Sequence, residues 1–318
     1  MFDDVRIAAS EAIGVLRRVG VSDEVAAIQA VGGGGISSVF EMSTRGGASY
    51  IVKVYPESFA WKLAKEVFVY ERLSTIAGLP VPTVIGWDDS RMIIDAHFLV
   101  LSKLPGVMLS GITDASLNEQ AEVYHQLGMH LRAMHKLTFD QFGYLYTGVV
   151  EGHSTNRDYM QFQFNKKLTE FRSAGGPSLI ATAIERFVEE RVSALDICKT
   201  ASLCHDDVYE NNLLVERTHQ GLVLTGLLDV ENAVAGDPLI DLSKTWLYAI
   251  RTAEHKWHGL IDGYGSLGHR ADERLDLYRL YHSLELWDWF AQLGNSAGVA
   301  SVTPDLEEFS TSTGAWAL

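Results

Sequence analysis

The polar stretch at residues 203–215, LCHDDVYENNLLV, constrains the fold of this 318-residue chain more than any other feature. It holds one histidine, two aspartates, one glutamate and two asparagines between apolar residues. Such a run is either a polar turn between two strands or a catalytic loop fixed by hydrophobic neighbours. The strand-like segments NLLVE and GLVLTGLLDVE come next, separated by RTHQ. A hairpin of these two segments would bring the polar residues at its two ends together.

The sequence around this loop divides into a β-rich part and a helical part. Before residue 105, strand-like runs alternate with turns, and the segment WKLAKEVFVYERL has apolar residues at helical spacing. After residue 105, apolar residues recur at helical spacing in three long segments. We therefore predict an α+β fold of two lobes, and we expect the polar C-terminal stretch SVTPDLEEFSTSTGAWAL to be a loosely held tail.

The predicted lobes meet at the turn Pro105-Gly106. Residues 1–104 are expected to form a small antiparallel β lobe with one main helix. Residues 105–318 are expected to form a larger, mostly helical lobe that carries the hairpin. The runs expected to be strands in the first lobe include Ser38–Met42, Tyr50–Tyr55 and Phe98–Leu101.

The composition narrows the class of function. A formal net charge of −15 disfavours nucleic acid and anionic membranes as partners and favours a cationic or neutral ligand. The two cysteines, Cys198 and Cys204, show neither metal-ligand spacing nor a disulfide framework, which is typical of a reducing compartment. The N-terminal residues lack the pattern of a signal peptide, and no apolar run is long enough to span a bilayer. We therefore expect a cytoplasmic monomer or homodimer that binds neither nucleic acid nor membrane.

Three residues of the polar stretch follow the spacing H-x-D-x-x-x-x-N. They are His205, Asp207 and Asn212, and Asp229 follows Asn212 after a further 17 positions. Phosphoryl transfer needs a carboxylate to orient the attacking hydroxyl, together with oxygen ligands for Mg²⁺. A loop, a hairpin and a following acid can deliver these groups to one place. The alternative, a polar turn in a core sheet, is weakened by the downstream segment GDPLIDLSKTW.

This part of the sequence resembles the aminoglycoside phosphotransferase and choline kinase-like family, whose core is similar to that of protein kinases. The resemblance implies that Asp207 is the catalytic base and that Asn212 and Asp229 are Mg²⁺ ligands. It also implies that His205 braces the loop. Asp206 departs from the pattern, because the family usually has a small residue, most often glycine, at that position.

The first lobe contains the features that this resemblance implies for binding ATP. The run GGGGISSVFEM is similar to a glycine-rich flap over phosphates, although four glycines also fit a flexible turn. Lys53 would contact the phosphates and pair with Glu66, for which Glu71 is a rival; a solvent-facing lysine and an unrelated helical acid are the alternative. FLVLSKLPG resembles a hinge that contacts adenine through backbone groups, but it also fits a buried strand before a turn. The implied nucleotide-binding residues are Gly34, Gly35, Ser37, Ser38, Lys53, Glu66, Ser102 and Leu104.

Acceptor specificity is expected from acidic and aromatic side chains near the ends of the late helices. Acids would attract an aminated sugar, and aromatic rings would stack on a sugar or nucleoside. The segment LELWDWF also fits an amphipathic core helix, and we expect Trp287 to lie in the core. The candidates are Glu231, Trp246, Tyr248, Glu285, Trp287, Asp288 and Trp289, and among them we predict acceptor contacts for Glu231, Asp288 and Trp289.

The combined pattern predicts a kinase that uses Mg²⁺ and ATP, with GTP not excluded, to phosphorylate a hydroxyl of a small molecule. An aminoglycoside-like or other antibiotic, modified for resistance or self-protection, fits the acidic charge. A metabolic kinase for choline, homoserine, methylthioribose or a sugar would share the same motifs. A protein kinase is disfavoured because Val230 and Glu231 follow Asp229 where an activation-loop motif would stand. A non-catalytic nucleotide-binding module would be expected to lose Asp207, Asn212 or Asp229.

Overall fold

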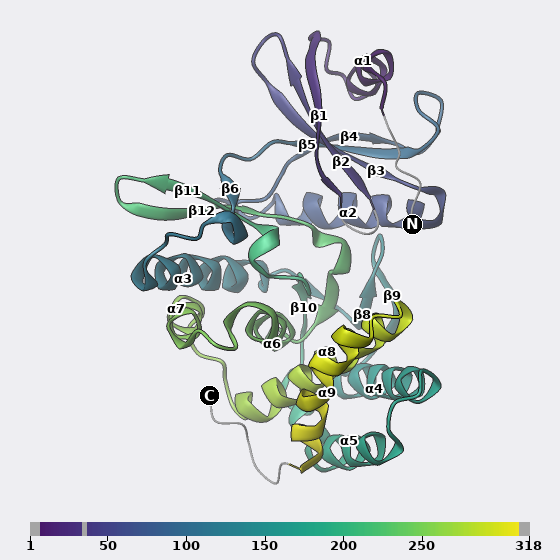
Figure 1. The fold of residues 1–318 in the computed structure, drawn as a ribbon, viewed down its shortest axis with the longest axis vertical. Helices are drawn as coiled ribbons and strands as arrows, with labels where there is room; N and C mark the ends of the chain where they lie inside the picture. The colour runs from purple at the N-terminus through teal and green to yellow at the C-terminus, as the bar shows by residue number, and fades with distance from the viewer. Residues whose placement is uncertain (1–6, 34–36, 312–318) are drawn as a thin grey trace. The chain divides into compact units, whose positions relative to one another are not determined.

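The computed structural model describes residues 7–33 and 37–311 of the chain. Antiparallel sheets and helices occur together in it (Figure 1), so the predicted α+β class is confirmed. Within the described residues, no helix combines the length and the apolar character needed to cross a membrane.

The described chain forms two compact units and passes several times from one to the other. Residues 210–231, which contain the predicted hairpin, belong to the same compact unit as the N-terminal sheet. The sequence analysis placed them in the helical lobe. Unit 1 comprises the described residues up to Thr113, Leu145–Gly148 and Glu210–Glu231. Unit 2 comprises Asp114–Tyr144, Val149–Tyr209 and the described residues from Asn232 onward.

A five-stranded antiparallel sheet forms the centre of unit 1, in the order β1-β2-β3-β5-β4 (Figure 1). Helix α1 (Ala9–Arg18) packs against it, and α2 (Ala60–Leu73) contacts β3, β4 and β5. The strands are β1 (Val25–Gly33), β2 (Ser38–Thr44), β3 (Ser49–Tyr55), β4 (Val84–Asp88) and β5 (His97–Ser102).

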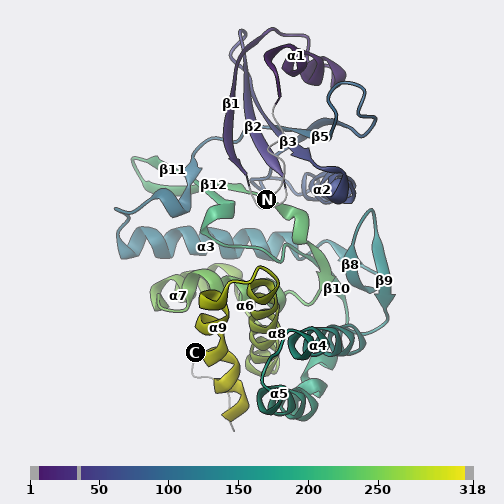
Figure 2. The same ribbon diagram turned by 45° about the vertical axis from the view of Figure 1, so that its right-hand side comes forward.

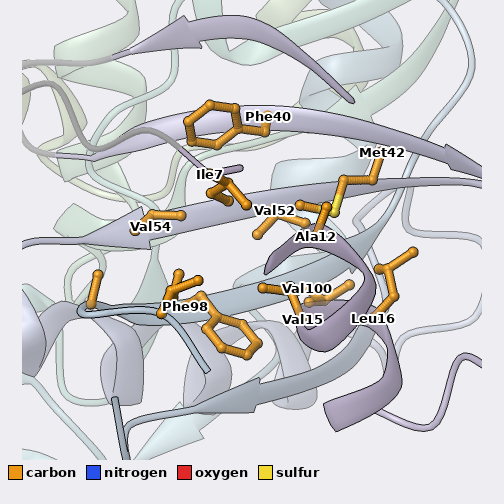
Figure 3. Close-up of a cluster of buried hydrophobic side chains, with 12 residues drawn as sticks. Ile7, Ala12, Val15, Leu16, Phe40, Met42, Val52, Val54, Phe98 and Val100 are labelled. Atoms are coloured by element: carbon orange, nitrogen blue, oxygen red, sulfur yellow. The ribbon is translucent and has the colours of Figure 1, made fainter. Parts of the chain in front are cut away.

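The alternation of side chains along β3 decides what Lys53 faces. Val52 and Val54 lie in an apolar cluster with Val15 and Leu16 of α1 (Figure 3). Successive residues of a strand point to opposite faces, so Lys53 lies on the other face of the sheet. Lys53 is only 7% exposed, which rules out the alternative of a solvent-facing lysine.

The predicted hairpin forms a second, three-stranded sheet in unit 1, in the order β12-β11-β6. Its strands are β11 (Leu213–Thr218), β12 (Gly221–Leu227) and β6 (Val107–Met108). Leu213 pairs with Leu227 at the open end of the hairpin, and the Leu228 N–H donates to the Asn212 carbonyl at 2.9 Å. This register brings the residues that precede β11 next to the residues that follow β12.

Unit 2 combines helices with a five-stranded sheet in the order β7-β10-β13-β8-β9. Helices α4 and α9 each contact both α5 and α8 (Figure 2). The strands are β7 (Thr138–Phe139), β8 (Phe142–Leu145), β9 (Val149–His153), β10 (Ala201–Cys204) and β13 (Val234–Gly236). The helices are α3 (Leu117–Met134), α4 (Asn156–Ser173), α5 (Ser178–Arg191), α6 (Leu239–Thr245), α7 (Glu254–Tyr264), α8 (Ala271–Gln292) and α9 (Ser296–Thr311).

Glycines allow α3 and α7 to approach each other closely. A Cβ at Gly128 of α3 would lie 2.2 Å from the carbonyl oxygen of Leu260 in α7. A Cβ at Gly263 of α7 would lie 1.9 Å from the carbonyl oxygen of His125. Both distances are shorter than any van der Waals contact, so the backbone packing of these helices requires glycine at both positions.

The expectation of a loosely held C-terminal tail, which began at Ser301, is wrong for residues 301–311, because they belong to α9. Three of its apolar side chains, Val302, Leu306 and Phe309, are buried. The ring of Phe309 meets that of Phe187 in α5 at a centroid distance of 5.4 Å. Burial of this apolar stripe stabilises the helix, although its sequence is polar elsewhere and contains Pro304.

Candidate active site

Lys53 is held by two carboxylates within unit 1. Its Nζ lies 2.8 and 2.7 Å from the two carboxylate oxygens of Glu66 in α2, and 2.9 Å from Oδ1 of Asp229. The Tyr55 hydroxyl donates to Glu66 Oε1 at 2.7 Å and fixes that carboxylate further. In the structure, Lys53 thus pairs with Glu66, as predicted, and not with the rival Glu71.

Burial and charge act in opposite directions on this group. Burial opposes the charged form of Lys53, but Asp229 and Glu66 raise its pKa well above the ordinary value. Burial also raises the pKa of Glu66, in spite of the attraction of Lys53. The Glu66 side chain is fully buried, whereas that of Asp229 is 38% exposed, so one carboxylate anchors the lysine and the other remains accessible to solvent.

The hairpin places Asn212 and Asp229 at its same end. Asn212 is buried in the turn before β11, and its carbonyl accepts the Leu228 N–H directly before Asp229. Asp229 has a left-handed backbone with φ 63°, and its N–H donates to the Tyr70 hydroxyl of α2 at 3.0 Å. The hydrogen bond to Tyr70 holds the strained residue in place.

The sequence analysis predicted that Glu231 contacts the acceptor. In the structure, Glu231 lies with Glu66 and Asp229 in unit 1. Lys62 Nζ lies 2.8 Å from Glu231 Oε1, and both side chains are nearly buried. Glu66, Asp229 and Glu231 each present one carboxylate oxygen within 4.8 Å of the others. Sequence reasoning missed Lys62, whose only signal is its position one helical turn before Glu66 on α2.

The predicted flap and hinge are described in part. Gly34 and Gly35 lie outside the described residues. Ser37 is buried, and Ser38 begins β2, opposite Gly33 of β1 and Val54 of β3.

The hinge residue Ser102 is the last residue of β5, and Leu104 follows the strand. The Ser102 N–H already donates to the Thr83 carbonyl at 2.9 Å, so an adenine contact at Ser102 would have to use another backbone group. Leu104 is half-buried in the connection after β5.

The catalytic-loop motif lies in unit 2, directly after β10. Asp241 of α6 accepts the N–H groups of His205 at 2.9 Å and of Asp206 at 2.6 Å. His135 Nε2 lies 2.9 Å from Asp241 Oδ2, and His135 Nδ1 lies 2.9 Å from the Tyr264 hydroxyl. Burial opposes the ionised form of Asp241, but the hydrogen bond from His135 and nearby charges lower its pKa. An ionised Asp241 thus holds the backbone of the loop.

Asp207 is half-buried and is contacted by Asn232 of the same unit. Asn232 Nδ2 donates to Asp207 Oδ2 at 3.2 Å. The pairing of Cys204 with Val234 explains the contact, because it sets the residues after β10 beside those before β13. Sequence reasoning missed Asn232; its position three residues after Asp229 is the available signal.

The other acceptor candidates differ in accessibility. Trp289 is 50% exposed. Asp288 is 4% exposed, and it lies 3.4 Å from Lys167 Nζ and accepts from Gln292 Nε2 at 2.8 Å. Trp287 is buried, with its ring 4.4 Å from that of Phe171, which confirms its place in the core.

A second group with metal-ligand chemistry consists of His135, Cys204 and Asp241 in unit 2. Burial, with several neighbouring acids, raises the pKa of the Cys204 thiol well above its ordinary value, which disfavours the thiolate that binds metals. His135 and Asp241 are already joined to each other and to the loop. We therefore interpret this group as structural support for the loop.

Comparison with solved structures shows a shared fold. A thermostable mutant of the aminoglycoside phosphotransferase APH(4)-Ia, in a ternary complex with AMP-PNP and hygromycin B, aligns with a TM-score of 0.73 and 19% identity over 95% of this chain and 98% of that chain. APH(2″)-IIIa, in a complex with GDP and kanamycin, aligns with a TM-score of 0.64 and 13% identity over 95% and 99% of the two chains.

A candidate fructosamine-3-kinase from Thermobifida fusca YX-ER1 aligns with a TM-score of 0.65 and 20% identity, over 95% of this chain and 99% of that chain. No curated protein sequence matched significantly. The model of the phosphotransferase enzyme family matches residues 27–287, which include Lys53, Glu66, Asp207, Asn212 and Asp229. The chain therefore belongs to the phosphotransferase enzyme family and is a small-molecule kinase, as its sequence predicted.

Proposed function

We propose that this protein transfers the γ-phosphoryl group of ATP, together with Mg²⁺, to a hydroxyl of a small molecule. The observation that carries the proposal is the buried Lys53, held by Glu66 and Asp229. A lysine fixed in this way presents a constant positive charge to phosphate oxygens. The AMP-PNP bound by APH(4)-Ia supports ATP as the donor, and the GDP bound by APH(2″)-IIIa keeps GTP as a candidate.

The donor set in unit 1 fits Mg²⁺. Asp229 and Glu231 supply carboxylate oxygens, and Asn212 at the same end of the hairpin supplies an amide oxygen, which are the hard ligands that Mg²⁺ prefers. Glu66 is occupied by Lys53 and Tyr55. We propose that Asn212 and Asp229 hold the ion, which when bound would neutralise charge on the phosphates.

Asp207 would orient the acceptor and receive its proton. The acceptor hydroxyl donates a hydrogen bond to the Asp207 carboxylate, and its oxygen forms a bond to the γ-phosphorus. The bond between that phosphorus and the oxygen shared with the β-phosphate breaks, ADP leaves, and the acceptor proton passes to Asp207. The hydrogen bond from Asn232 restricts the rotation of Asp207, so the carboxylate is oriented before the acceptor arrives.

We further propose an aminoglycoside-like or other antibiotic as the acceptor. The hygromycin B and kanamycin bound by two structural neighbours support this class, as does the formal charge of −15, which favours a cationic acceptor. Among the predicted acceptor residues, the exposed Trp289 keeps this role. The fructosamine-3-kinase candidate among the neighbours favours a second acceptor class, a modified sugar in metabolism.

A coupled ADP-release assay with Mg²⁺-ATP tests the proposal. The panel contains hygromycin B, kanamycin, a fructosamine, choline and homoserine, each measured with the wild type and with Asp207→Asn. We expect one acceptor class to raise ADP release by the wild type and to leave Asp207→Asn near background. ADP release that is identical in the two proteins would contradict the role of Asp207, and a response only to the fructosamine would favour the metabolic alternative.

A further inference from the structure

Asp206 occupies a backbone position that disfavours side chains. Its φ is 56°, in the left-handed region, where any residue other than glycine is strained by about 1 kcal/mol or more. Glycine is also the residue that the resemblance to related kinases leads one to expect here. Aspartate tolerates this conformation better than most residues, yet glycine would carry no strain at all. The side chain of Asp206 makes contacts that a glycine at this position could not make.

Those contacts come from a largely buried group of ionisable side chains, which we call the Asp206 cluster and which consists of Asp206, Lys244, His282 and Glu285. Lys244 Nζ lies 3.4 Å from Asp206 Oδ1 and 3.9 Å from Glu285 Oε2. His282 Nε2 lies 3.8 Å from the same oxygen of Asp206, and His282 Nδ1 lies 2.9 Å from Glu285 Oε2. The Lys244 side chain is 9% exposed and that of His282 is fully buried.

Helix α6 holds the catalytic loop at two successive points. Asp241 binds the backbone N–H groups of His205 and Asp206. Lys244, three residues later on the same face of the helix, forms an ion pair with the Asp206 side chain, with Nζ 3.4 Å from Oδ1. Asp207 is the next residue along the chain, and the charge of Lys244 also acts on it. A displacement of the Asp206 side chain would thus be passed directly to the backbone of Asp207.

We propose that Asp206 and Lys244 act as one unit that positions Asp207, with Lys244 as the positioning residue. This inference rests on the proposed role of Asp207 in phosphoryl transfer. In place of a glycine turn, the loop of this protein is fixed by an ion pair between residues 38 positions apart in the sequence, numbered 206 and 244.

Within the Asp206 cluster, the loss of Lys244 and the loss of Asp206 should have different consequences. Burial raises the pKa of Asp206 to about 6, against the attraction of Lys244 and His282. Burial likewise opposes the ionised form of Glu285, but Lys244 and His282 lower its pKa to about 2. Lys244 therefore serves two carboxylates. Its removal leaves Asp206 and Glu285 facing each other, whereas removal of Asp206 leaves Lys244 paired with Glu285.

The test compares Lys244→Met, Lys244→Arg, Asp206→Gly and the double variant Asp206→Gly/Lys244→Met, with Lys199→Met as the matched control. Lys199 is an exposed lysine of the same unit. Each protein is assayed for ADP formation from Mg²⁺-ATP with hygromycin B or, if that does not respond, with the panel acceptor that does. Thermal unfolding is measured in parallel to separate misfolding from lost turnover.

We expect Lys244→Met to lower kcat by about 10- to 100-fold while the KM for ATP changes less than about twofold, because none of the residues proposed to bind ATP belongs to the Asp206 cluster. Lys244→Arg should keep most of the activity. Asp206→Gly should cost less than Lys244→Met, and the double variant should recover activity relative to Lys244→Met, because it no longer leaves two carboxylates opposed. Lys199→Met should match the wild type.

A Lys244→Met protein that turns over like Lys199→Met would overturn the proposal. So would losses that simply add in the double variant. If Lys244→Met does not fold, Asp206→Asn provides the same test, because asparagine accepts the left-handed backbone and removes only the charge; unchanged kcat in that variant would overturn the proposal too. Failure of the proposed function shows separately, as absence of acceptor-dependent ADP release by the wild type.

Discussion

Lys53 Nζ lies 2.9 Å from Asp229 Oδ1, although 176 positions separate these residues in the sequence. The strand β3 supplies the lysine, and the end of the β11–β12 hairpin supplies the acid. Within unit 1 the chain thereby joins the group proposed to bind phosphate to a group proposed to bind Mg²⁺. Glu66 completes the arrangement by fixing the lysine from α2.

Replacement of Lys53 by alanine should chiefly weaken the use of ATP. We expect kcat/KM for ATP to fall by about 100-fold, the effect of losing one charged group that acts on the transition state. Arg45→Ala is the matched control, because Arg45 is exposed and pairs with Glu24 within the same unit. Steady-state kinetics with varied ATP measure the effect. An ATP dependence equal to that of Arg45→Ala would remove the proposed role of Lys53.

Asn232→Ala should lower kcat by about tenfold and leave the KM for ATP unchanged. Its hydrogen bond to the Asp207 carboxylate is charge-assisted, and loss of such a bond costs about 1.5 kcal/mol or more. Asn118→Ala, at an exposed position of α3, serves as the control. The measurement is kcat at saturating ATP and acceptor. If KM for ATP rises and kcat stays constant, Asn232 acts on nucleotide binding and not on Asp207.

Asp229→Asn should raise the Mg²⁺ concentration required for half-maximal turnover by about tenfold or more, because a neutral amide replaces a charged ligand. The same change removes one of the two carboxylates that hold Lys53, so ATP use should also weaken. Titration of activity with Mg²⁺ at fixed ATP measures the first effect. Asp89→Asn, at an exposed position of unit 1, is the matched control. A Mg²⁺ requirement equal to that of this control would contradict the assignment of Asp229.

Acid should destabilise the protein partly through Glu285. Its pKa is lowered from 4.5 to about 2, so the stability that its ionised form contributes is complete above pH 4.5 and is lost as the pH falls through 2. Lys244 and His282 from α6 and α8, Lys167 from α4 and the opposed Asp206 are the charges that act on it. The contribution amounts to at most about 3 kcal/mol at neutral pH.

Chemical denaturation at several pH values checks this prediction. The difference in unfolding free energy between the wild type and Glu285→Gln should be largest above pH 4.5 and should shrink toward pH 2. A difference that is independent of pH would show that Glu285 contributes through packing alone. Glu185→Gln, whose exposed carboxylate pairs with Arg172, provides a comparison in which little pH dependence is expected.

Local patterns in the sequence were sufficient for much of the fold and the site. The spacing of His205, Asp207 and Asn212 identified the loop, and the resemblance to the kinase family identified Lys53 as the partner of Glu66. These features depend on residues within a few positions of one another or on elements with clear periodicity. The three helical segments after residue 105 were recognised for the same reason.

The remaining features depend on contacts that local patterns do not encode. Lys62 and Glu231 form a buried pair across 169 positions, and nothing in the neighbourhood of either residue indicates it. The ion pair of Asp206 and Lys244 is of the same kind. Short strands such as β7 have too few residues to show alternation. Helix α9 was missed because its stability depends on contacts with α5 and α8.

The measurement that tests the central claim most directly is ³¹P NMR of a reaction containing Mg²⁺-ATP and the responding acceptor. The account predicts that, with the wild type, the γ-phosphate signal of ATP decreases while the signals of ADP and of a new phosphomonoester on the acceptor increase. Asp207→Asn should slow this reaction by about 100-fold or more. ADP accompanied only by inorganic phosphate, or an equal rate in Asp207→Asn, would contradict the claim that Asp207 directs phosphoryl transfer to an acceptor hydroxyl.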